Sequence, residues 1–169
     1  AYLNGATGKG ALVAVIDSGV NAVPELQGQL HANSTNVATG NTADKGDLNG
    51  HGTWMAGIIA AKQNHSTKSG VNMHGIAFNS QILNINATDS ANCDTSDCTF
   101  FHSNIAKAYE HAIANNVDVV NESLGSDTPT SAKLLEDMEK AVAADILIVL
   151  PAVNRDDVDP STTPRTATE

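Results

Sequence analysis

Three polar residues of this chain have the types and the order of an acyl-transfer site. Asp17 follows an apolar run at residues 12–16, and His51 comes next along the chain. Asn154 follows a second apolar run, at residues 146–150. In such a site a carboxylate orients an imidazole base, and hydrogen-bond donors hold an oxyanion. The sequence offers no convincing nucleophile to complete the set.

Length and composition favour one domain with an aliphatic core. The chain has 169 residues, of which 41% are hydrophobic and only 4% aromatic. Its net charge of −10 argues against a nucleic-acid partner, because the phosphate backbone would repel it. The acidity makes a structural calcium ion plausible, but no complete ligand loop is evident, so we expect no required cofactor. The apolar run at residues 146–150 predicts a buried strand, and no apolar run of the chain is long enough to span a bilayer.

The hydrophobic pattern predicts strands alternating with helices. Apolar runs predict strands, and one-sided apolar stripes or small residues predict helices. The strands are expected at 12–16, 81–87, 117–121 and 146–150, and the helices at 52–62, 103–116 and 131–144. The helix at 103–116 is expected to begin with Ser103 as its N-cap. This alternation implies right-handed crossovers, and therefore an α/β fold with a parallel sheet.

The polar candidates fall at positions that such a sheet brings together. Asp17, Ser123-Leu124-Gly125 and Asn154 each come just after a predicted strand, and His51 leads a predicted helix. Functional groups of parallel sheets gather at the carboxyl ends of the strands. We therefore expect these residues along one edge of the sheet.

Four segments resemble motifs of the subtilisin-like serine proteases, the subtilases. Residues 13–19 (VAVIDSG) resemble the aspartate motif of that family, and residues 51–57 (HGTWMAG) its histidine motif. Residues 112–125 are similar to the helix and substrate strand, and residues 151–154 to the turn with the oxyanion asparagine. The resemblance implies a three-layer, mostly parallel α/β fold with helices on both faces, truncated at its carboxyl-terminal side.

The resemblance also implies a role for each candidate. Asp17 would fix the tautomer of His51, and His51 would act as general base and then general acid. The Asn154 amide would donate to the oxyanion. Ser123-Leu124-Gly125 would pair with an extended peptide substrate, and the segment near residues 98–100 would form the opposite edge of the cleft. No metal belongs to this set.

The family's Gly-Thr-Ser motif is absent. Ser161, the only serine after Asn154, lies between prolines and is followed by no periodic apolar pattern. We therefore expect residues 1–155 to form a partial catalytic domain and residues 156–169 an irregular tail or the start of the missing part. The chain alone should be inactive, and the missing carboxyl-terminal part of the same protease is a candidate partner.

The sequence leaves three interpretations to compare. The chain is a fragment of an active protease, or a pseudoprotease that binds peptides without cleaving them. A nucleotide-binding domain is disfavoured because no phosphate-binding glycine loop follows the first strand.

Two residues depart from the family pattern. Glu122 lies where the family usually has an uncharged residue, and Val153 lies where glycine is common.

The two cysteines bear on location. The spacing of Cys93 and Cys98 admits either a small disulfide loop or two free thiols. With the family resemblance, the cysteine pair leads us to expect a secreted or cell-surface protein.

Overall fold

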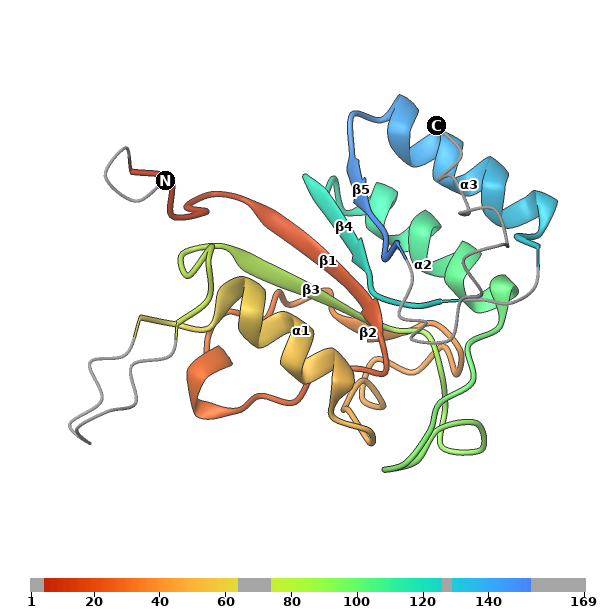
Figure 1. Cartoon of the computed structure of the whole chain (residues 1–169), viewed down its shortest axis with the longest axis horizontal. Coiled ribbons are helices and arrows are strands. Elements are labelled where there is room, and N and C mark those ends of the chain that lie inside the picture. Colours follow the sequence, from red (N-terminus) through yellow and green to blue (C-terminus); the bar gives the residue numbers. More distant parts are fainter. Residues whose placement is uncertain (1–4, 64–73, 126–128, 153–169) are drawn as a thin grey trace, which may run out of the picture.

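A five-stranded parallel sheet with helices on both faces organises the molecule (Figure 1). The computed structural model describes residues 5–63, 74–125 and 129–152. The strands are β1 (Leu12–Asp17), β2 (Thr35–Asn36), β3 (Gln81–Asn86), β4 (Val119–Glu122) and β5 (Leu147–Val149). The helices are α1 (His51–Ala60), α2 (His102–Ala114) and α3 (Ala132–Ala143), with a short 3-10 helix η2 (Pro24–Leu26). The strand order is β2-β3-β1-β4-β5, and every pairing is parallel.

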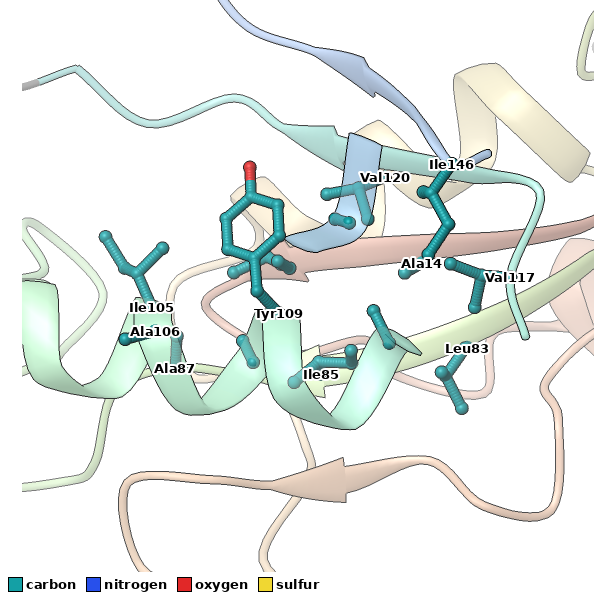
Figure 2. Close-up of a cluster of buried hydrophobic side chains, with 14 of the residues drawn as sticks. Ala14, Leu83, Ile85, Ala87, Ile105, Ala106, Tyr109, Val117, Val120 and Ile146 are labelled. Atoms are coloured by element: carbon teal, nitrogen blue, oxygen red, sulfur yellow. The ribbon is translucent and has the colours of Figure 1, made fainter. Parts of the chain in front are cut away.

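Strand β1 lies at the centre because its side chains are apolar on both faces. Val13 and Val15 pack toward α1, in a cluster with Ala56 and Ala60 of that helix. The alternate residues of β1 belong to the cluster on the other face, which α2 and α3 cover (Figure 2). In Figure 2 the ring of Tyr109 extends from α2 toward the sheet. The predicted three-layer α/β fold is thereby confirmed.

The boundary of α2 differs from the sequence expectation by one residue. The helix begins at His102 instead of Ser103, and its N-cap is Phe101, which makes no side-chain capping bond. Helix α3 does have a side-chain cap, because the Ser131 hydroxyl accepts from the Leu134 N–H at 3.4 Å.

Strand β5 is not the buried strand that its composition predicted. It ends the strand order and pairs only with β4 among the described residues. Ile148 packs against the α2–α3 cluster, whereas Leu147 is 62% exposed and Val149 44%. Neighbouring strand residues point to opposite faces, so these two side chains lie on the α1 side of the sheet, uncovered. An apolar strand needs neighbours on both sides to be buried, and β5 has one.

The other edge strand, β2, has only two residues and was not predicted. No helix in the described ranges has the length and apolar character needed to cross a membrane. The predicted division between residues 155 and 156 lies outside the described residues.

Candidate active site

The end of β1 and the start of α1 bring Asp17 and His51 into contact. His51 Nδ1 lies 2.9 Å from both carboxylate oxygens of Asp17. Asp17 is fully buried, whereas the His51 side chain is 41% exposed. A carboxylate accepts hydrogen bonds, so this contact favours the tautomer with the proton on Nδ1, which places the lone pair of a neutral ring on Nε2. No other hydrogen bond to the His51 ring occurs within the described part of the chain.

Gly52 allows β1 and α1 to approach each other this closely. A Cβ at Gly52 would lie 2.1 Å from the carbonyl oxygen of Gly19 and 3.1 Å from Cβ of Asp17. Real Cβ atoms do not reach such distances from a backbone oxygen, so a side chain here would push the helix away from the strand. A glycine directly after the histidine is therefore a steric requirement of the Asp17–His51 contact.

A second buried carboxylate, that of Asp47, is linked to the Asp17–His51 pair through Ser18. It hydrogen-bonds the Ser18 hydroxyl at 2.9 Å, and Ser18 donates its own N–H to Asp17 Oδ1 at 2.7 Å. Burial opposes ionisation of Asp47, but hydrogen bonds from Thr53, Gly50 and Ser18 outweigh it and lower the pKa of this carboxyl. Neither Asp47 nor Ser18 was among the site residues predicted from the sequence. An Asp just before a predicted helix is a capping signal that could have drawn attention to Asp47.

A cleft of about 270 Å³ opens beside the pair. It is bordered by the pair itself, by residues that follow β4 and by the loop before α2. Its lining residues are Asp17, Ser18, Asn49, His51, Ser96, Asp97, Cys98, Phe100, Ser123, Leu124 and Gly125. The predicted segments 123–125 and 98–100 therefore share one cleft with Asp17 and His51.

A disulfide joins Cys93 to Cys98, so the free-thiol alternative does not hold.

Glu122 directly precedes the cleft segment 123–125 and is 7% exposed. Its Oε2 accepts a hydrogen bond from the Tyr109 hydroxyl at 2.7 Å. Burial raises the pKa of Glu122, although the Tyr109 hydrogen bond partly opposes this rise. Burial and the nearby Glu122 likewise raise the pKa of Tyr109. The acid that departs from the family pattern is thus buried and hydrogen-bonded to α2.

A comparison with known protein families decides the membership of this chain. The family model described as the subtilase family, Peptidase S8, matches residues 8–168. This chain is a subtilase.

Curated relatives of this subtilase are bacterial proteases. The minor extracellular protease Epr of Bacillus subtilis is 34% identical over 155 residues, which are 91% of this chain and 21% of Epr. The subtilisin of Bacillus pumilus is 33% identical over 154 residues, 90% of this chain and 50% of the relative. An intracellular serine protease of Paenibacillus polymyxa is 33% identical over 167 residues, 96% of this chain and 47% of the relative. The subtilase chain thus spans half or less of the length of these relatives.

Solved structures agree with this assignment. A cold-adapted subtilisin-like serine proteinase matches with a TM-score of 0.66 at 26% identity, over 86% of this chain and 47% of that one. Sphericase matches with a TM-score of 0.72 at 24% identity, over 86% of this chain and 46% of that one, and supports the fold.

Several sequence predictions for this subtilase lie outside the described residues. They concern Asn154, Val153 and Ser161. Within the ranges that are described, no group of three or more His, Cys, Asp or Glu side chains is placed to hold a metal ion.

Proposed function

We propose that this subtilase chain supplies the acid, the base and the peptide-binding strand of a serine endopeptidase that works through an acyl-enzyme. The observation that carries the proposal is the contact at 2.9 Å between Asp17 and His51, together with the position of the His51 ring beside the cleft. Asp17 is buried and its oxygens face Nδ1, so the ring is held in the tautomer whose Nε2 can accept a proton.

His51 would take the proton of an attacking hydroxyl and return it to the leaving amine. The carbonyl carbon of the substrate gains the bond to the hydroxyl oxygen, and the carbonyl oxygen becomes the oxyanion. When the carbonyl forms again, the bond from this carbon to the amide nitrogen breaks, and water then releases the acyl group from the hydroxyl oxygen by the same two steps. The Asn154 amide is proposed to donate to that oxyanion, an interaction worth about 3–4 kcal/mol in such sites. Asp17 would stabilise the imidazolium that forms in between.

The cleft between two backbone segments suits an extended polypeptide. Residues Ser123, Leu124 and Gly125 continue from β4, and residues near Cys98 and Phe100 lie on the same cleft. We propose that the peptide pairs with residues 123–125 as an added strand, so that main-chain hydrogen bonds give affinity. Among the described residues, no atom lies within 4 Å of the position that a Cβ at Gly125 would take, which leaves room for a backbone to approach.

The nucleophile is proposed to come from a further polypeptide segment. Ser96 and Ser123 line the cleft, but no hydroxyl in the described part of the chain is hydrogen-bonded to the His51 ring. Strand β5 ends the strand order of the described residues, so the carboxyl-terminal part of the protease could continue the sheet along its edge and cover the exposed Leu147 and Val149. Alone, the chain should not hydrolyse peptides.

Reconstitution tests this proposal. The chain is mixed with a polypeptide that carries the Gly-Thr-Ser segment of the family, and hydrolysis of a fluorogenic peptide is measured. We expect turnover only in the mixture, abolished by His51→Ala and lowered about 10⁴-fold in kcat by Asp17→Asn. A His51→Ala mixture as active as the original mixture would refute the role of the ring.

Because no hydroxyl among the described residues is hydrogen-bonded to the His51 ring, a second candidate function is a pseudoprotease that binds peptides without cleaving them. It predicts saturable binding of an unlabelled peptide to the chain alone and no turnover in any mixture. Turnover in the reconstituted sample would exclude it.

The cellular location is proposed to be secreted or cell-surface. The Cys93–Cys98 disulfide fits an oxidising compartment. Among the relatives, Epr is named extracellular, whereas the Paenibacillus polymyxa protease is named intracellular. Fractionation of cells that produce the protein, with an antibody against this chain, would decide between the two.

A further inference from the structure

We propose that Asp47 is a positioning residue for the Asp17–His51 pair, acting through the Ser18 hydroxyl and the first turn of α1. The inference concerns the geometry of the pair. It rests on the proposed function only for the consequence that it has on turnover.

Asp47 caps the helix whose first residue is His51. Gly50 is the N-cap of α1 and has no side chain with which to bond the free N–H groups of the first turn. Asp47 Oδ1 instead accepts from the N–H groups of Asn49 at 3.1 Å and Gly50 at 2.8 Å. Its Oδ2 accepts from the Thr53 N–H at 2.9 Å and from the Thr53 hydroxyl. The orientation of the turn that carries His51 therefore depends on this carboxylate.

The Ser18 hydroxyl connects the two carboxylates. Its Oγ lies 2.9 Å from Asp47 Oδ1 and 3.2 Å from Asp17 Oδ1, and it accepts from the Gly52 N–H at 3.1 Å. A hydroxyl has one proton, so it can donate to only one carboxylate at a time. The shorter distance assigns the proton to Asp47. As a result, Asp17 is left to accept from the Ser18 N–H and from His51.

Removing the acceptor at position 47 would change this arrangement. The Ser18 proton would turn to Asp17 Oδ1 and compete with His51 Nδ1 for the same oxygen. An isosteric Asp47→Asn change cannot keep both sets of contacts, those to Ser18 and Gly50 and those to Thr53. If the amide oxygen faces Thr53, the amide NH₂ faces Ser18 and Gly50, and in the flipped orientation it faces the Thr53 N–H. One set of contacts is lost in either case.

The network is buried, which makes it sensitive to such a change. Asp47 is 8% exposed and Ser18 is 1% exposed, so water cannot easily replace a lost partner. Donors from the loop and from α1 keep Asp47 ionised, and the positive end of the helix dipole favours that charge.

The first test is nuclear magnetic resonance of the 169-residue chain, together with the carboxyl-terminal polypeptide if the chain requires it to stay in solution. The probe is the ¹H signal of His51 Nδ1–H, which reports on its hydrogen bond to Asp17. Asp47→Asn and Ser18→Ala should each broaden or shift this signal. The matched control, Asp44→Asn, removes the same charge from an exposed side chain in the same loop and should leave the signal unchanged.

Ser18→Ala keeps the Asp47 cap on α1, so it remains informative if Asp47→Asn fails to fold. The proposal would be overturned if the His51 Nδ1–H signal were the same in Asp47→Asn and Ser18→Ala as in the Asp44→Asn control. This holds even if Asp47→Asn lowers the melting temperature. The signal change needs no peptide hydrolysis, and it can therefore be present even if the proposed protease function fails.

Kinetics of the reconstituted enzyme supply the second test. Misplacing the base affects the transition state more than peptide binding, so Asp47→Asn should lower kcat about 10–100-fold and leave KM within about twofold of Asp44→Asn. An equal kcat for Asp47→Asn and Asp44→Asn would overturn the positioning role.

Discussion

Replacing Glu122 by Gln should remove a pH dependence of stability that follows from burying this acid. Burial raises the pKa of Glu122 above its ordinary value of 4.5 in the folded state. Between 4.5 and the raised value, the folded chain holds a proton that the unfolded chain has released. The folded state binds more protons over this window, so the free energy of unfolding falls as the pH rises through it. Gln cannot ionise, and its amide oxygen can still accept from Tyr109.

The magnitude follows from the ionisation constant. Each tenfold by which burial weakens the acid corresponds to about 1.4 kcal/mol at a pH above both pKa values. We expect Glu122→Gln to be more stable than wild type at a pH above both pKa values, by that amount for each such tenfold, and to match it near pH 4. Tyr109→Phe should have the opposite effect. It removes the donor and should cost about 1.5–3 kcal/mol when Glu122 is ionised, and about 1 kcal/mol when it is neutral.

Urea unfolding at pH 4, 6 and 8, followed by far-ultraviolet circular dichroism, measures both effects. Glu139→Gln, which changes an exposed acid on α3, serves as the control and should parallel wild type at each pH. The double variant Tyr109→Phe/Glu122→Gln completes a cycle that isolates the coupling between the two side chains. A constant difference between Glu122→Gln and wild type over the three pH values would refute the reasoning.

Three further outcomes can be measured on the same chain. Gly52→Ala should lower the free energy of unfolding in urea by about 1–3 kcal/mol. The clash with the Gly19 carbonyl outweighs the roughly 1 kcal/mol that alanine gains in a helix. The control Gly125→Ala should change the free energy of unfolding by less than about 0.5 kcal/mol. Reducing the Cys93–Cys98 disulfide, which closes a short loop, should cost about 2 kcal/mol, and unchanged unfolding with dithiothreitol would contradict this. We expect the exposed edge strand β5 to promote self-association of the chain. Leu147→Lys places a charge on this strand and should therefore lower the association measured by sedimentation velocity. Equal association of both forms would refute this role of β5.

The central strands were accessible from the sequence because their signals are local, whereas the Asp17–His51 contact was expected from the resemblance of residues 13–19 and 51–57 to the subtilase motifs. The β-branched run of β1 ends at Asp17, and the small residues of α1 follow His51 directly. Such patterns depend little on distant parts of the chain. The periodic stripe of α2 likewise located that helix to within two residues at each end.

What the sequence did not reveal depends on distant partners. The two residues of β2 have no apolar pattern and form a strand only because β3 lies beside them. The exposure of β5 follows from its place in the strand order, which its uniform apolar composition cannot express. The Ser18–Asp47 contact joins residues 29 positions apart, and no spacing rule links a strand end to a loop at that distance.

The place of β1 in the middle of the sheet has a consequence during translation. Strand β1 leaves the ribosome before both of its neighbours, and it obtains the second of them, β4, only about 100 residues later. At ordinary elongation rates this interval lasts roughly 5–20 s. A nascent chain thus carries its acid and its imidazole well before it has the wall against which a peptide could lie.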